Sequence, residues 1–203
     1  YFARFVILGE GDSERVVIPR IAEEMGVSLD PSFVPIVPLG GRFVAHFWRL
    51  LNDLEIPHAT LLDLDLGRRH GGANAMRSCL QDLADIGNNF GSTNGANAAQ
   101  LTDQQLYNEG LQGQWLQAFR SEGVFFSYPI DLDFAMLLAF PTAYQVDAFK
   151  WYPYLFLSRS KPETHLAAFS RIAGSGVTAS APLELRALIE YVTDKLNLSG
   201  ENE

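Results

Sequence analysis

Acidic residues follow three short apolar runs of this chain. They are Glu10, Asp12 and Glu14 of GEGDSE, Asp63 and Asp65 of DLDLG, and Asp131 and Asp133 of PIDLDF. Hard divalent cations such as Mg²⁺ and Mn²⁺ prefer carboxylate oxygens as ligands. Two such ions about 4 Å apart need several carboxylates that converge from different elements. The pattern therefore predicts a two-metal site, provided that the fold brings the three acidic groups together.

Glu10 is the strongest candidate in the first group. It precedes the expected start of a helix near Asp12, and it lies between two glycines, which suit a close approach of the backbone. Glu14 lies four residues later and shares a face with Glu10 if the helix starts near Asp12. The alternative is that Asp12 or Ser13 caps this helix and that Glu14 only interacts with its positive end. For Glu14 the two interpretations are equally supported.

The two later groups differ in how strongly they indicate chemistry. In an extended chain alternate residues point to one side, so Asp63 and Asp65 are expected to face the same ion. Asp131 and Asp133 have a simpler explanation on pattern alone, because either can cap the helix that follows.

The surrounding elements predict where these groups meet. Strands are expected at residues 2–8, 33–37, 59–62 and 124–127. Helices are expected at residues 12–25, 43–54, 74–86, 104–120, 134–140, 162–172 and 182–196. Strands that alternate with helices predict right-handed crossovers and a parallel sheet, and therefore an α/β fold. Sites in such sheets form outside the carboxyl ends of the strands, which is where the acidic groups fall.

Composition narrows the class of protein. The net charge of -9 argues against a chain that nucleic acid wraps broadly, but bound metal ions change the local sign of a site. No run approaches the roughly 18 apolar residues of a membrane span, and no signal peptide is recognisable. The single cysteine, Cys79, cannot form an internal disulfide, which favours a reducing, cytoplasmic setting, and we interpret it as a small buried apolar residue. Because the chain begins at Tyr1, inside an expected strand, we expect it to be a piece of a longer protein.

Five segments resemble the Toprim domain of OLD-family (overcoming lysogenization defect) nucleases. They are VILGEGDSERVVIPRIAEEMG, VPLGG, LNDLEIPHATLLDLDLG, FFSYPIDLDFAML and SKPETHLAAF. The resemblance runs from about residue 5 to about residue 196. It implies a Toprim-like (Rossmann-like) fold with a mostly parallel central sheet flanked by helices. The implied catalytic core spans residues 1–140, with a flexible insertion around 87–112, and a C-terminal helical extension spans 141–203.

The resemblance implies an endonuclease that hydrolyses DNA phosphodiester bonds with two divalent ions. These would be Mg²⁺ or Mn²⁺, with Ca²⁺ as a substitute in a crystal. The implied ligands are Glu10, Asp63 and Asp65 for one ion, and Glu14 and Asp133 for the other. Many members have Leu-Glu where this chain has Leu-Asp, so the shorter reach leaves Asp131 or a bridging water as an alternative ligand.

Basic residues complete the expected site. Lys161 of SKP resembles the active-site lysine of the family, where it would act in catalysis and contact DNA. Arg68 and Arg69 follow DLDLG and are candidates for steering the phosphate backbone, although an exposed basic pair is nearly as well supported. We interpret His70 as a solvated loop residue and assign no role to His165 or the remaining histidines.

The resemblance also implies partners. DNA is the expected substrate, the family usually carries an ATPase domain in the same polypeptide, and a homo-oligomer and a role in phage defence are expected for the full-length form. No GxxxxGK[ST] motif occurs here, so nucleotide hydrolysis is not attributed to this chain.

Three other functions compete with this one. A non-catalytic Toprim scaffold in DNA repair or defence is the main alternative. A haloacid-dehalogenase-type phosphatase also uses DxD, but normally on its first strand, whereas DLD follows the third expected strand here. A GDSL-type esterase needs a later DxxH, which the chain lacks.

Overall fold

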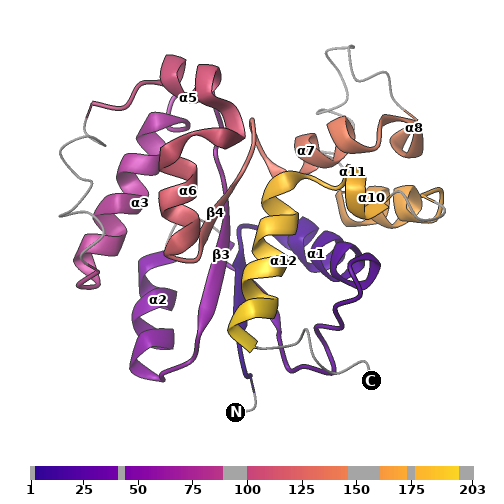
Figure 1. Ribbon diagram of the computed structural model, residues 1–203, viewed down its shortest axis with the longest axis horizontal. Helices are drawn as coiled ribbons and strands as arrows, with labels where there is room; N and C mark the ends of the chain where they lie inside the picture. The colour runs from indigo at the N-terminus through magenta and orange to yellow at the C-terminus, as the bar shows by residue number, and fades with distance from the viewer. Residues whose placement is uncertain (1–2, 41–43, 89–99, 146–160, 173–176, 197–203) are drawn as a thin grey trace.

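The computed structural model describes residues 3–40, 44–88, 100–145, 161–172 and 177–196 (Figure 1). Its strands are β1 (Val6–Gly9), β2 (Ile36–Pro38), β3 (His58–Asp63) and β4 (Val124–Ser127). The first helices are α1 (Asp12–Glu24), α2 (Val44–Asp53), α3 (Ala73–Asp85), α5 (Asp103–Glu109), the 3₁₀ turn η1 (Gly110–Gln112) and α6 (Gln114–Ser121). The later helices are α7 (Leu132–Ala139), α8 (Pro141–Tyr144), α10 (Lys161–Phe169), α11 (Val177–Ser180) and α12 (Leu183–Leu196).

The strands form one parallel sheet in the order β2-β1-β3-β4. Gly9 pairs with Pro38 on one side and Leu61 on the other, and Asp63 pairs with Ser127. The carboxyl ends of all these strands therefore lie at one edge of the sheet. The α/β fold with a parallel central sheet, predicted from the sequence, is confirmed.

Helices cover both faces of the sheet, as Figure 1 shows, with α2, α3 and α6 on one side and α1 and α12 on the other. Successive strand residues point to opposite faces, so Ile7 packs with the α1 and α12 side, and Leu8 packs with the α2 and α3 side. A strand that is buried on both faces is apolar at most positions, and a buried polar residue such as Thr60 of β3 needs a partner, here Trp48 Nε1 at 2.8 Å. Burial on both faces is why the strands read as mostly apolar runs in the sequence.

Helix α12 packs directly against the sheet. Leu188, Ile189 and Val192 of α12 are fully buried and belong to the same core cluster as Phe125 of β4. Their spacing at i, i+1 and i+4 places them on one helix face. Helix α12 therefore forms part of one of the two helical layers.

The chain departs from the expected elements at several points: β1 begins at Val6 rather than at residue 2, and the short helices α8 and α11 were not expected. Two further departures have a local cause. β2 begins at Ile36 rather than at residue 33, because Phe33 has a φ of 56° and closes a turn in which its N–H donates to Asp30. The expected helix over 104–120 is divided into α5, η1 and α6, since Gly110, the residue after α5, has a φ of 55° that an α-helix cannot continue through.

Two further expectations concern segments that are not described. Much of the expected flexible loop, residues 89–99, and the expected first residue of the second helix, Phe43, lie outside the described residues. Among the described residues, no helix has both the length and the apolar character that a membrane crossing requires.

Candidate active site

A cleft of about 420 Å³ opens at the carboxyl edge of the sheet and joins residues from all three acidic groups. It is lined by Glu10, Gly11, Asp12, Ser13, Glu14, Asp63, Asp131, Leu132, Asp133, Lys161 and Pro162. These residues come from the end of β1, α1, the end of β3, α7 and α10. The parallel order of the strands brings the acidic groups together, because each group follows or ends its own strand.

Two carboxylates tie the strand ends to one another. Glu10 follows β1, and its Oε1 accepts the backbone N–H of Asp63 at 2.9 Å. Asp63 ends β3, and its Oδ1 accepts the backbone N–H of Leu132 at 3.3 Å. The positions of Glu10 and Asp63 are therefore set by backbone groups of the neighbouring segments.

Glu14 has a structural contact as well as a place in the cleft. Helix α1 begins at Asp12, and Gly11 is its N-cap residue. Glu14 Oε2 accepts the N–H of Gly11 at 3.0 Å. The prediction that Asp12 or Ser13 caps this helix is wrong, because neither side chain accepts a capping hydrogen bond and the Ser13 hydroxyl is used elsewhere.

Asp133 is buried among donors that come from two other helices, α1 and α10. Its Oδ1 accepts hydrogen bonds from Ser13 Oγ at 2.7 Å and from His165 Nε2 at 2.8 Å, and its Oδ2 is ion-paired with Lys161. Burial by itself raises the pKa of Asp133, but the hydrogen bonds from His165, Lys161 and Ser13 outweigh burial, so the pKa lies below its ordinary value. An ionised Asp133 therefore holds Lys161 at the cleft.

His165 is a site residue that the sequence interpretation missed. It is fully buried, and its Nδ1 lies 2.6 Å from the hydroxyl of Tyr144, opposite the nitrogen that contacts Asp133. Because an ionised carboxylate only accepts, Nε2 carries the proton of the hydrogen bond to Asp133. The available signal was spacing, since His165 lies four residues after Lys161 and so shares a face of α10 with it.

Asp65 does not face the cleft in the way that the DLD spacing suggested. β3 ends at Asp63, and Asp65 has a φ of 53°, so the segment is not extended through Asp65. The carboxylate of Asp65 accepts a hydrogen bond from Arg68 Nη1 at 2.5 Å. The residues that line the cleft do not include Asp65.

Arg68 joins the second and third acidic groups. Its Nη2 lies 3.7 Å from Asp131 Oδ2, while Asp131 Oδ1 caps α7 by accepting the N–H of Phe134 at 2.8 Å. Asp131 therefore caps α7, as the sequence predicted, but with only one of its two oxygens, and the other lies near Arg68. Arg69 is exposed on the same loop.

The cleft is electrostatically costly without a bound cation. Burial raises the pKa of Asp63 well above its ordinary value, and the negative charges of Glu10 and Glu14 raise it further. Burial also raises the pKa of Asp131, and it raises that of Glu14 to about 7. These carboxylates would ionise more readily beside a positive ion.

The stability of the metal-free chain should fall as the pH rises from 4.5 to about 7, because Glu14 holds its proton longer in the folded state than in the unfolded state. The expected loss from Glu14 alone is on the order of 3 kcal/mol. Glu14→Gln keeps an acceptor for Gly11 and removes the titration. Urea unfolding in EDTA at pH 5 and pH 8 should therefore show a smaller loss in Glu14→Gln than in the unaltered chain, and equal losses would contradict the prediction.

The carboxylates of the cleft are chemically suited to a hard cation, but their oxygens are not arranged around one point where an ion could sit. The cleft offers carboxylate oxygens, which suit Mg²⁺ or Mn²⁺. Within the described residues, however, no group of three or more His, Cys, Asp or Glu side chains is placed to hold a metal ion. Glu10, Glu14 and Asp133 instead accept hydrogen bonds from protein donors, and ion binding would have to exchange some of these contacts.

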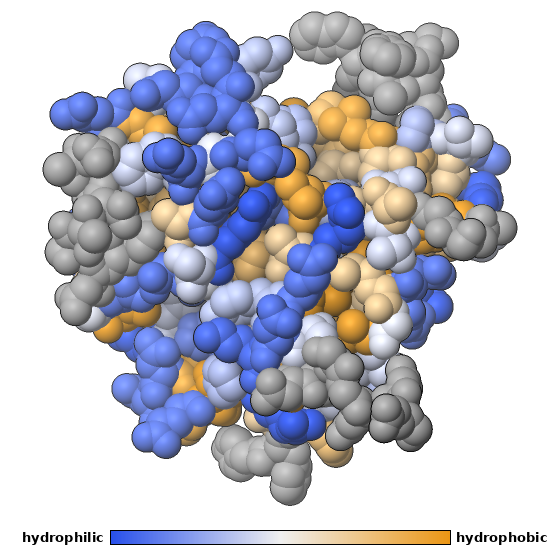
Figure 2. All heavy atoms as spheres, in the orientation of Figure 1, coloured by the Kyte–Doolittle hydropathy of each residue, from blue (hydrophilic) through white to orange (hydrophobic). Residues whose placement is uncertain are grey.

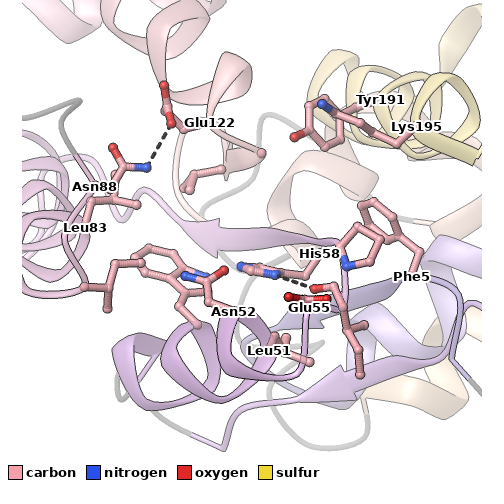
Figure 3. Close-up of a pocket in the computed structure, with 16 residues that line it drawn as sticks. Phe5, Leu51, Asn52, Glu55, His58, Leu83, Asn88, Glu122, Tyr191 and Lys195 are labelled. Atoms are coloured by element: carbon pink, nitrogen blue, oxygen red, sulfur yellow. Dashed lines mark hydrogen bonds between the residues drawn. The ribbon is translucent and has the colours of Figure 1, made fainter. Parts of the chain in front are cut away.

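A second cleft, also of about 420 Å³, lies at the opposite edge of the sheet (Figure 3). It includes His58 at the start of β3, with Tyr191 and Lys195 of α12 on its other side. His58 Nδ1 contacts the carbonyl of Ile56 at 3.1 Å, and burial lowers the pKa of His58. None of the acidic residues predicted for the metal site lines this cleft.

Comparison with known proteins relates the N-terminal part of the chain to a protein family. Residues 1–65, which contain β1, β3, Glu10 and Asp63, match the family described as "Overcoming lysogenization defect protein-like, TOPRIM domain". Residues 1–65 are therefore similar to an OLD-like TOPRIM domain. The resemblance recognised in the sequence is thereby confirmed, and the match ends at Asp65, the second aspartate of DLD.

Solved structures with the same fold extend the comparison to the whole chain. The C-terminal region of the Xanthomonas campestris pv. campestris OLD protein superimposes with a TM-score of 0.68 at 18% identity, over 98% of each chain. The C-terminal region of the Burkholderia pseudomallei OLD protein gives a TM-score of 0.59 at 22% identity, over 97% of this chain and 100% of that one. No curated protein matches the chain. At these identities the likeness shows the fold.

Proposed function

We propose that this chain is a metal-dependent endonuclease domain that hydrolyses DNA phosphodiester bonds with two divalent ions, Mg²⁺ or Mn²⁺. The observation that carries the proposal is the convergence of Glu10, Glu14, Asp63 and Asp133, from three separate segments, on one cleft that also contains Lys161. The OLD-like TOPRIM match supports the same reaction class. An acidic cleft with one lysine suits a polyanionic substrate only when cations are bound in it.

The proposed ligand sets follow the chain order. Glu10 and Asp63 hold one ion, with Asp65 joining them if Arg68 is displaced. Glu14 and either Asp133 or Asp131 hold the other. Bound divalent ions would supply an acidic water and stabilise negative charge on the leaving oxygen.

The remaining residues of the site either contact the DNA phosphates or hold other site residues in position. Lys161 supplies a fixed positive charge that favours the developing negative charge at phosphorus. Asp133 positions Lys161, and Ser13 and His165 hold Asp133 in place. We assign Arg68 and the exposed Arg69 to contacts with the DNA backbone.

The proposal includes a wider setting. We infer that the domain acts beside an ATPase domain of the same polypeptide, in a homo-oligomeric, cytoplasmic protein with a role in phage defence. The buried Cys79, the single cysteine of the chain, is compatible with a reducing compartment.

Nicking of supercoiled plasmid tests the proposal. The unaltered chain should convert supercoiled DNA to the open-circular form with Mg²⁺ or Mn²⁺ and not with EDTA, whereas Glu10→Gln should lose at least about 100-fold in rate, since a ligand is removed. Glu23→Gln is the matched control, because Glu23 is an exposed glutamate on α1 outside the cleft. Full activity in Glu10→Gln would exclude the proposed site.

A non-catalytic TOPRIM scaffold is the second candidate, and one observation favours it. The acidic side chains are held by protein donors and are not arranged around an ion in the described part of the chain. A scaffold would bind no divalent ion in the cleft. Calorimetric titration with Mn²⁺ separates the two, because the nuclease should show heat that Glu10→Gln removes, and the scaffold should show none.

A further inference from the structure

A more apolar cleft of about 570 Å³ adjoins the acidic one. Its walls come from α5 and η1 on one side and from α7, α11 and α12 on the other, and its floor contains Ser127 at the end of β4. Leu132 lines both clefts, so the two clefts share part of their walls. Figure 2 shows apolar side chains gathered over α7, on the face in view. The cleft volume lies within the roughly 300–1,000 Å³ that is usual for small-molecule sites.

Two polar atoms in this cleft are buried and unsatisfied. Ser127 Oγ and Arg186 Nε have no hydrogen-bond partner among the described residues, and Ser127 is only 2% exposed. Buried polar groups are nearly always satisfied in folded proteins, because leaving one without a partner costs stability. A ligand that offers acceptors to both donors would account for this pair.

The other lining residues restrict the chemistry of that ligand. Leu132, Ala135 and Leu138 favour an apolar surface. Glu184 also lines the cleft, but its carboxylate is paired with Arg120. This pairing offsets its negative charge, so Glu184 does not repel a hydrogen-bond acceptor placed at Arg186. The ligand should therefore be largely apolar and carry a few hydrogen-bond acceptors.

Two tyrosines lie among the lining residues. Tyr107 of α5 is 70% exposed, and Tyr128 follows β4. An exposed aromatic ring beside an apolar cleft offers a stacking surface for a flat ligand. Nucleobases combine a flat apolar face with carbonyl and ring-nitrogen acceptors at the edge, and they stack on aromatic side chains.

We propose that this cleft, which we call the base cleft, receives one nucleobase of the DNA strand, turned out of its stack beside the scissile phosphate. The inference rests on the proposed nuclease function, because the neighbouring acidic cleft would hold the phosphate of the same strand. Ser127 Oγ and Arg186 Nε donate to the base edge, and Tyr107 stacks on its face. The base cleft thereby selects strands with an unpaired nucleotide at that position, since flipping is easiest there.

Equilibrium binding of single-stranded oligonucleotides tests the inference without cleavage. A fluorescent 12-nucleotide strand is titrated with the 203-residue chain in Ca²⁺, which takes the place of Mg²⁺ or Mn²⁺ in the acidic cleft, and it is compared with strands that carry one abasic nucleotide at successive positions. Ser127→Ala and Arg186→Gln should each weaken binding of the intact strand by about tenfold. One abasic position should weaken binding by the unaltered chain to a similar extent, and the two variants should bind that abasic strand as the unaltered chain does.

Controls separate this inference from folding and from the proposed reaction. Ser127→Ala removes an unsatisfied group, so its melting temperature should stay the same or rise, and Arg20→Gln, an exposed change on α1, controls for lost positive charge. Equal weakening of intact and abasic strands, or no weakening, overturns the base cleft. If Ser127→Ala and Arg186→Gln give that result and still nick plasmid with Mg²⁺, the base cleft is rejected and the proposed nuclease function is retained. Absence of both nicking and strand binding overturns both.

Discussion

Asp63→Asn should abolish metal-dependent nicking and, in the same protein, raise the melting temperature of the metal-free chain. Asp63 is surrounded by Glu10, Glu14, Asp131 and Asp65, and burial together with these negative charges raises its pKa well above the ordinary value. A neutral amide removes that repulsion, and its carbonyl oxygen can still accept the Leu132 N–H. With a gain of about 1–2 kcal/mol, the melting temperature should rise by about 2–8 °C.

The loss of activity should exceed about 100-fold, because the amide is a poor substitute for a charged ligand of a hard cation. A second signature should accompany it. Mg²⁺ or Mn²⁺ should raise the melting temperature of the unaltered chain by preferential binding to the folded state, and this rise should be lost in Asp63→Asn. Differential scanning calorimetry with EDTA and with each ion measures both effects.

Asp30→Asn is the matched control, since Asp30 is an exposed aspartate in the turn before β2. It should change neither the nicking rate nor the response to metal. A variant of Asp63 that is less stable than the unaltered chain in EDTA would contradict the electrostatic account of the cleft. One that is more stable and fully active would contradict the metal site.

Gly9→Ala should destabilise the chain by about 1–3 kcal/mol, the range expected for overpacking a buried site. A Cβ at Gly9 would lie 2.6 Å from Cγ and 2.7 Å from Cβ of Glu14, so helix α1 or the end of β1 must move. Glu14 would then lose its place in the cleft. We expect at least a tenfold lower nicking rate, because displacements of about 1 Å at a catalytic site are costly.

Gly11→Ala is the comparison that makes this prediction specific. Gly11 has a φ of -147°, which alanine adopts freely, and an added Cβ would meet only Glu14 Oε2 at 3.7 Å. Its cost should stay below about 1 kcal/mol, the loss of a favoured N-cap residue. Urea unfolding of both variants, with nicking assays on each, measures the difference. If the two variants had equal effects, the close contact with Glu14 would not explain why a glycine is needed at position 9.

The sequence alone was sufficient for the fold and for the edge of the sheet on which the acidic residues meet. Strands buried on both faces are mostly apolar, and helices that cover a sheet carry an apolar face, so the local pattern indicates both kinds of element. Parallel strands place their carboxyl ends at one edge. Glu10 and Asp63 could therefore be assigned to a common cleft from their positions after β1 and at the end of β3.

The tertiary structure decided which side chains face one another. Ser13 and Asp133 are separated by 120 positions and meet at 2.7 Å, and His165 reaches the same carboxylate from another helix. Asp65 turns to Arg68 because its backbone leaves the extended region, which the DLD spacing does not reveal. A short motif limits local conformation, whereas hydrogen-bond partners, burial and pKa depend on residues that only the packed chain brings within reach.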